Sequence, residues 1–79
     1  MSPTVLRIKS YRFHFWSLEE DRMHVHVSAP DGIAKFWLEP IVALANYEGL
    51  RGHQLKEVEK IVKEHQHEII RAWKSHFKS

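Results

Sequence analysis

The first half of the chain alternates apolar and polar residues in four short runs. These runs are Val5–Lys9, Tyr11–Trp16, Met23–Ser28 and Ile33–Leu38. Because alternate residues of a β-strand point to opposite faces, each run predicts a strand with one apolar face. That face collects the residues that we expect to form the core: Leu6, Ile8, Tyr11, Phe13, Phe15, Val25, Val27, Ala34, Phe36 and Leu38.

The opposite parity of the same runs carries bases, histidines and tryptophans. We call this set the cationic face: Arg7, Lys9, Arg12, His14, Trp16, His24, His26, Lys35 and Trp37. A solvated face normally mixes acids with bases, but none of the ten acidic residues of the chain falls on this set. The pattern favours a phosphate-bearing or otherwise anionic partner.

Turn residues separate the runs. Lys9-Ser10 is short enough for a tight hairpin, the polar segment 17–22 predicts a loop, and Pro30-Asp31-Gly32 has the chemistry of a turn. Two antiparallel hairpins are therefore expected.

After Leu38 the apolar period becomes helical. Pro40 suits a first helical turn, Ile41, Leu44 and Ala45 share one helical face, and Gly49 suits the end of that helix. From Gln54 to Phe77 apolar residues recur every three or four positions, which predicts one long amphipathic helix. Its stripe includes His65, which we interpret as a core or boundary residue, and Trp73 and Phe77, which we interpret as core anchors.

These elements predict one α+β domain over residues 1–79, in which a four-stranded antiparallel sheet of two hairpins is followed by two helices packed on its apolar face. The cationic face would stay open. The chain has no cysteine, no secretory signal pattern and no membrane-spanning run, so we expect a soluble cytoplasmic protein. A domain of this size is marginally stable alone, which makes a partner or a homo-oligomer plausible.

His24 and His26 stand two residues apart on one strand face. Such a pair could act as acid and base, or could bind a metal together with His14, although further ligands are lacking. Ordinary solvated strand histidines are the third interpretation. We find no phosphate loop, nucleophile elbow or carboxylate pair, which argues against an ATPase, an elbow-type hydrolase or a glycosidase.

Arg7, Arg12 and Lys35 could hold phosphate, and Trp16 and Trp37 could stack on bases. Trp and Arg are also enriched at protein interfaces, so the same face could dock a partner protein. The sequence leaves both interpretations open.

Several segments carry a family resemblance: Pro3–Ile8, Tyr11–Phe13, His24–Val27, Ala34–Leu38, Pro40, Asn46-Tyr47, Glu64-His65, Ala72-Trp73 and Phe77. In this order and spacing the chain resembles, over essentially its whole length, the small bacterial proteins grouped as domain of unknown function 4160. The resemblance implies a gene often placed beside that of a second small protein, in a suspected toxin–antitoxin pair. It assigns no reaction.

Two positions depart from the pattern of that family. The family usually has two prolines before its His-x-His, where this chain has Arg22 and Met23. It also commonly caps the long helix with Ser, where this chain has Arg51 and Gly52. The start of the third strand is therefore expected to differ.

Three hypotheses follow. The leading one is a toxin-like protein that acts on RNA and has a small antitoxin-like partner. If this protein is a metal-independent endoribonuclease, His24, His26 and Lys35 would exchange protons with the RNA. Arg7 and Arg12 would stabilise the charge of the phosphorane. The second is a non-catalytic module that docks a protein through the Trp and Arg residues. The third is a metal-binding regulator built on His14, His24 and His26. No cofactor and no membrane partner is expected under the leading hypothesis.

Overall fold

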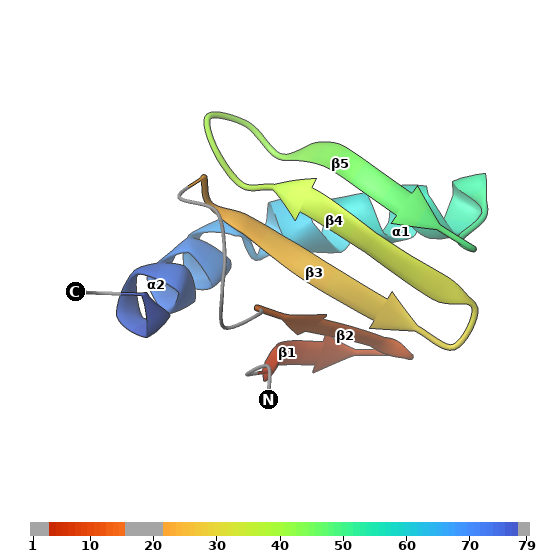
Figure 1. Cartoon of the computed structure of the whole chain (residues 1–79), viewed down its shortest axis with the longest axis horizontal. Coiled ribbons are helices and arrows are strands. Elements are labelled where there is room, and N and C mark those ends of the chain that lie inside the picture. The colour runs from red at the N-terminus through yellow and green to blue at the C-terminus, as the bar shows by residue number, and fades with distance from the viewer. Residues whose placement is uncertain (1–3, 16–21, 78–79) are drawn as a thin grey trace.

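A computed structural model describes residues 4–15 and 22–77. Five strands precede two helices along the chain: β1 (Thr4–Ile8), β2 (Tyr11–His14), β3 (His24–Ala29), β4 (Gly32–Trp37), β5 (Ala43–Glu48), α1 (Gly52–Glu64) and α2 (Gln66–His76). Figure 1 shows the sheet in front and α1 behind it. The prediction of an α+β fold with an antiparallel sheet followed by two helices is confirmed.

The sheet has five strands, not the four that the sequence predicted. Their order is β1-β2-β3-β4-β5, and each strand pairs antiparallel with the next. Both predicted hairpins, β1–β2 and β3–β4, are present, and β5 adds one further edge strand.

The predicted helix from Pro40 to Gly49 is wrong, because most of this segment forms β5. Its apolar residues recur at three- and four-residue steps, which fits a helix but also fits a short strand with a bulge. β5 has such an irregularity, since Lys35 pairs with Asn46 whereas Phe36 pairs with Leu44. Backbone pairing with β4 therefore outweighs a weak local period.

Two glycines allow β4 and β5 to approach closely where β5 ends. A Cβ atom on Gly32 would lie 2.1 Å from the carbonyl oxygen of Glu48, and one on Gly49 would lie 2.3 Å from that of Asp31. Gly49 also has a φ of +83°, in the region that side chains disfavour. Gly49 thus ends an element as predicted, but the element is a strand.

The predicted long helix is divided at His65, whose φ of −111° and ψ of 18° lie outside the helical range. Just beyond the break, Gln66 donates a hydrogen bond from Nε2 to the carbonyl oxygen of Leu38, at 2.8 Å. This bond ties the start of α2 to the residue that follows β4. As a result α1 crosses behind the sheet, while α2 lies at the end where β3 begins (Figure 1).

The core lies between the apolar face of the sheet and the helices. The buried sheet residues are Tyr11, Phe13, Phe15, Val25, Val27, Ala34, Phe36 and Leu38, and the buried helix residues are Val58, Ile61, Val62, Ile69 and Trp73. Leu6, Ile8 and Phe77 are half-buried against this cluster. The core predicted from strand parity and helical period is therefore confirmed. In the part of the chain that the structure describes, neither helix is long and apolar enough to cross a bilayer.

Candidate functional site

Three rows of side chains cross the sheet on the face opposite the core. Strand register sets each row, because directly paired residues of an antiparallel sheet lie on the same face. The first row is Arg7, Arg12, Ser28, Ile33 and Glu48; the second is His14, His26, Lys35 and Asn46; the third is His24, Trp37 and Ala43. The register thus brings Arg7, Arg12, the three histidines, Lys35 and Trp37 to one face.

One residue assigned to the cationic face is not found there, and a second falls where the structure gives no description. Lys9 occupies the β1–β2 turn with a φ of +57°, and its ammonium bonds the carboxylate of Glu57 on α1, on the core side of the sheet. The placement of Lys9 on the cationic face is therefore wrong, because the turn ends the strand parity one residue earlier. Trp16 lies outside the described residues.

The Lys9–Glu57 contact includes a third residue, Tyr11, whose hydroxyl donates a hydrogen bond to Glu57 at 3.0 Å. The hydrogen bonds from Lys9 and then from Tyr11 lower the pKa of Glu57 below its ordinary value. Burial, followed by the bond to Glu57, raises the pKa of Tyr11. This cluster fastens the first hairpin to α1 and lies away from the cationic face.

The histidines of the cationic face are buried, whereas the sequence predicted an open and solvated face. The exposed fraction is 4% for His14, 0% for His24 and 9% for His26. Their rings form a chain, with centroids 5.8 Å apart for His14 and His26 and 5.1 Å apart for His24 and His26. Strand parity indicated correctly that they share a face, but parity does not show what covers it.

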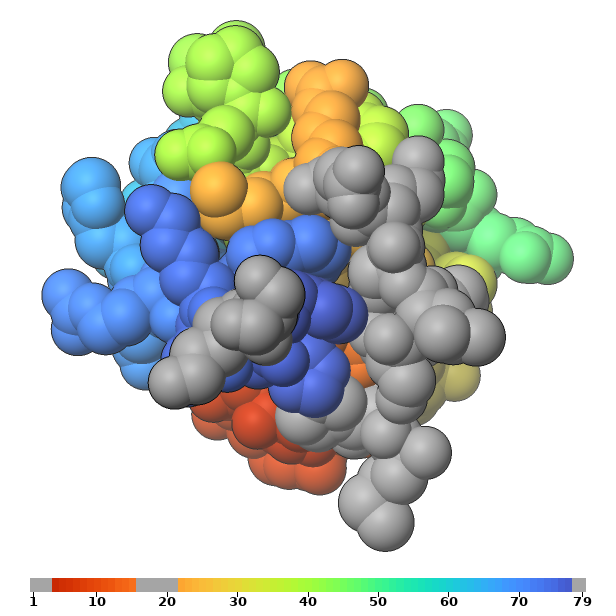
Figure 2. All heavy atoms as spheres, turned by 60° about the vertical axis from the view of Figure 1, so that its left-hand side comes forward, coloured from red at the N-terminus to blue at the C-terminus, as the bar shows by residue number. Residues whose placement is uncertain are grey.

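His24 is fixed by contacts with both the sheet and α2. Its Nδ1 donates a hydrogen bond to the carbonyl oxygen of Arg22 at 2.7 Å, since a carbonyl can only accept. Its ring centroid lies 5.0 Å from that of Trp73 and 5.7 Å from that of Trp37. Figure 2 shows α2 (blue) lying against the start of β3 (orange) at this end of the sheet. A fully buried ring with these contacts holds α2 in place.

His14 and His26 lie side by side in register in the second row. A 2.8 Å hydrogen bond joins His14 Nε2 to the hydroxyl of Ser28, and His26 faces Lys35 directly across the β3–β4 ladder. Among the residues that the structure describes, no group of three His, Asp or Glu side chains is placed to hold a metal ion. The third hypothesis, a metal-binding regulator, stays a prediction.

Trp37 is the centre of a cluster of cations. The guanidinium carbon of Arg22 lies 4.2 Å from the ring centroid, and Nζ of Lys35 lies 4.6 Å from it. Both distances are typical of cation–π contacts. Trp37 was predicted to stack on a base; in this structure its ring positions two cations that could hold an anion.

Arg22 is the site residue that sequence reasoning missed. It was assigned to the loop before the third strand, where the resemblance leads one to expect proline. A signal was available in the pairing of the strands: His24 is opposite Trp37, so a residue two positions before His24 can reach the same ring. The contact between Arg22 and Trp37 therefore adds Arg22 to the candidate site.

The far side of the face carries a second pair of cations. Arg7 and Arg12 are directly opposite each other on β1 and β2, and Arg7 is exposed. Arg12 extends across β1, because its Nε donates a 2.7 Å hydrogen bond to the hydroxyl of Thr4. Two guanidiniums on neighbouring strands can bind one phosphate from two sides.

One acidic side chain also belongs to this face, which the sequence did not predict. Glu48 comes at the end of β5, opposite Ile33, and so completes the first row at the edge away from Arg7. Since β5 was assigned to a helix, Glu48 was assigned to no face. The charge therefore changes sign across the first row, from arginine on β1 and β2 to glutamate on β5.

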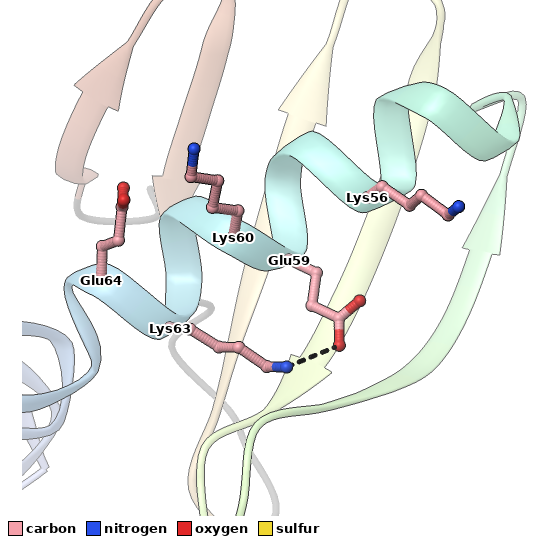
Figure 3. A pocket seen from close by; sticks show the side chains of 5 residues that line it. All are labelled: Lys56, Glu59, Lys60, Lys63 and Glu64. Atoms are coloured by element: carbon pink, nitrogen blue, oxygen red, sulfur yellow. Dashed lines mark ion pairs between the residues drawn. The ribbon is translucent and has the colours of Figure 1, made fainter.

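A shallow depression also occurs on the outer side of α1 (Figure 3). Its lining residues all come from this helix: Lys56, Glu59, Lys60, Lys63 and Glu64. Lys63 and Glu59 form an ion pair at 3.4 Å, one turn apart. Alternating charge at this spacing is typical of a solvated helix surface, and such a pair adds little stability.

The fold and these contacts define a small α+β domain whose antiparallel sheet carries a cationic surface with a buried histidine centre. The chain belongs to the DUF4160 family, a domain of unknown function, and the family model matches residues 10–74. Comparisons with curated proteins and with solved structures found no match. The matched range runs from the start of β2 into α2, so it includes the histidines and Trp37 but not Arg7.

Proposed function

We propose that this protein is the toxin-like member of a bacterial toxin–antitoxin pair and that it binds RNA in the cytoplasm through its cationic face. The observation that carries the proposal is the placement of four cations on the accessible parts of one face. Arg7 and Arg12 lie together on β1 and β2, while Arg22 and Lys35 lie over the Trp37 ring. Cations held in fixed positions on a sheet suit a phosphate backbone.

Binding is better supported than cleavage. His24 and His26 were predicted to exchange protons with an RNA, but a general acid or base must come within hydrogen-bond reach of the substrate. His24 is fully buried and already donates its Nδ1 hydrogen to Arg22. His26, which is 9% exposed, faces the half-buried Lys35 across the β3–β4 ladder. We therefore propose RNA binding as the primary activity.

A second candidate, protein docking, is favoured by Ile33. This residue is 48% exposed and sits within the first row, between Ser28 and Glu48. An apolar residue that shares its sheet face with Lys35 and the half-buried Trp37 resembles the mixed anchors of protein interfaces. A partner protein would then cover the surface that the leading proposal gives to RNA.

The test is fluorescence anisotropy of a short labelled single-stranded RNA at several salt concentrations. Each phosphate contact contributes about −0.7 to the slope of log K against log salt for single strands. We expect Arg7→Gln combined with Lys35→Gln to weaken binding and to reduce the slope by about 1.4. Lys56→Gln combined with Lys60→Gln removes the same charge from α1 and is the matched control.

Three outcomes discriminate the proposals. Equal weakening by both double variants would show binding by net charge alone and would contradict the assignment to the cationic face. Absence of RNA binding by the unaltered protein at low salt would favour protein docking. Cleavage of the RNA in the presence of EDTA, abolished by His26→Ala, would restore the endoribonuclease hypothesis.

A further inference from the structure

The exposed large apolar residues of the described chain gather at one edge of the sheet. They are Ile33, Ile41, Leu44 and Tyr47, with exposed fractions of 48%, 69%, 40% and 54%. Three of the four lie between residues 41 and 47, on β5 or just before it. Scattered exposed apolar residues are ordinary, whereas a group on one element indicates a contact surface.

β5 is also an edge strand with little protection. It pairs only with β4, and Glu48 is the single charged residue among its six. Sheet edges usually carry charges or prolines that prevent pairing with another chain. The opposite edge, β1, has Arg7 within the strand and Lys9 directly after it.

The bulge places two of these apolar residues on the same face. Leu44 and Tyr47 are three positions apart and would point to opposite faces of a regular strand. The extra residue, Ala45, corrects this: Leu44 is opposite Phe36 and Tyr47 is opposite Ala34, both of which are buried in the core. Leu44 and Tyr47 therefore extend the apolar face of the sheet beyond the part that α1 covers.

We propose that β5 pairs antiparallel with β5 of a second copy of this chain, across a two-fold axis between Ala45 and Asn46. This register opposes Leu44 to Tyr47 of the second copy on the core side of the sheet. It also opposes Ala43 to Glu48 of the second copy on the cationic side. Every opposed pair outside the bulge then shares a face, which antiparallel pairing requires.

Charge complementarity favours a second copy as the occupant. The carboxylate of Glu48 has no hydrogen bond or ion pair with the residues that the structure describes. In the proposed register it lies beside the small Ala43 of the second copy, which pairs with Trp37. Trp37 of the second copy is thus two strand spacings, or roughly 10 Å, from Glu48 of the first copy. Arg22 and Lys35 lie over the ring of Trp37 in each copy. The acidic end of one copy thus meets the cations of the other.

The expected dimer is weak. The bulge interrupts the backbone ladder at the axis, so strand pairing is limited to the two ends of β5. An interface formed by one short strand from each copy is small among specific protein contacts. We therefore expect a dissociation constant of about 1–100 µM. The inference does not depend on RNA binding, and its tests contain no RNA.

The first test is sedimentation equilibrium of the purified protein over a range from about 1 µM to 1 mM, which brackets the expected constant. Tyr47→Lys should raise the dissociation constant at least about tenfold, because it places an unpaired charge in the apolar contact. Ser10→Lys is the matched control, since it adds the same charge at an exposed position in the β1–β2 turn, at the opposite edge of the sheet. It should change the constant by less than about twofold.

The second test locates the contact. The chain has no cysteine, so a nitroxide can be attached at Asn46→Cys alone or at Arg7→Cys alone. In a β5–β5 dimer the labels on Asn46 should lie within about 20 Å, whereas the labels on Arg7, some nine strand spacings apart, should be separated by roughly 40 Å.

A monomer throughout the concentration range would overturn the proposal. So would a dimer whose Arg7 labels are the closer pair, or one that Ser10→Lys and Tyr47→Lys weaken equally. Circular dichroism of each variant at low concentration shows whether it is folded. A folded Leu44→Lys variant gives a second measurement if Tyr47→Lys does not fold.

Discussion

The centre and the margins of the cationic face differ in exposure although they lie on the same face of one sheet. His14, His24 and His26 in the centre are at most 9% exposed, while Arg7 at one margin is exposed and Lys35 and Trp37 toward the other are half-buried. Burying a neutral imidazole costs less solvation free energy than burying a guanidinium, which stays charged and has to remain near water or an anion. The centre therefore stabilises the fold, and the margins are available to a partner.

The largest expected effect is at the contact between the centre and α2. Trp73 packs edge-on against Phe15, with ring centroids 5.3 Å apart, and lies 5.0 Å from His24. Trp73→Ala should lower the free energy of unfolding by about 3–5 kcal/mol, because it leaves a large cavity. Urea unfolding followed by circular dichroism measures the change.

The control for Trp73 is Arg71→Ala, on the exposed side of the same helix. It should change stability by less than about 0.5 kcal/mol. A Trp73→Ala protein as stable as this control would contradict the role of α2 in closing the core.

The second effect distinguishes a structural histidine from a recognition residue. His24→Ala removes the donor to the Arg22 carbonyl and the ring beside Trp73. We expect a loss of about 2–3 kcal/mol from the unmet hydrogen bond and the cavity together. His67→Ala, exposed on α2, is the control. Unchanged stability together with a loss of RNA binding would show that His24 serves recognition and not the stability of the fold.

Strand parity predicted which residues share a face, and it succeeded because a period of two needs no tertiary information. Val25 and Val27 enter the core while His24 and His26 lie opposite, as their alternation indicated. Among the predicted strand residues that the structure describes, parity failed only at Lys9, where the turn redirects the side chain to Glu57.

The burial of the histidines could not be predicted from the strands. It depends in part on the break at His65, after which α2 turns toward the start of β3 and brings Trp73 to His24. Val62 and Ile69, on either side of the break, keep the spacing of apolar residues that one continuous helix would have, so the helical period does not reveal the break.

β5 escaped prediction for a related reason. Its segment has a helical spacing at Ile41, Leu44 and Ala45, while the feature that makes it a strand is the free edge of β4. Glu48 was assigned to no face because its strand was missed. Arg22 lies before β3 and not within it, so strand parity gives it no face, and its contact with Trp37 brings it to the site.

A smaller effect concerns the core side of the sheet and its dependence on pH. Hydrogen bonds from Lys9 and then Tyr11 lower the pKa of Glu57 from an ordinary 4.5. The carboxylate of Glu57 therefore binds a proton more readily in the unfolded chain than in the folded protein. The stability that Glu57 contributes is present above the ordinary pKa and is lost as pH falls through the lowered pKa of the folded protein. Tyr11 acts in the opposite direction, since its raised pKa gives stability that is lost as pH rises above about 10.

Glu57→Gln should flatten the fall of the urea midpoint between about pH 5 and pH 3. Glu64→Gln, exposed on the same helix, is the control and should leave the fall unchanged. Identical acid profiles for both variants would show that the Lys9–Glu57 contact contributes nothing to folding.

The smallest expected effect on stability is at the exposed margin. Arg7→Gln changes a solvent-facing side chain at the edge strand, and such substitutions usually shift stability by less than about 0.5 kcal/mol. Arg7 also faces Arg12, and like charges directly opposite each other are unfavourable, so the variant can even be slightly more stable. If the margin serves recognition, the same variant should weaken RNA binding and reduce the salt slope by about 0.7. Urea unfolding and anisotropy of one preparation measure both quantities, and a loss of stability equal to that of His24→Ala would remove the distinction between centre and margin.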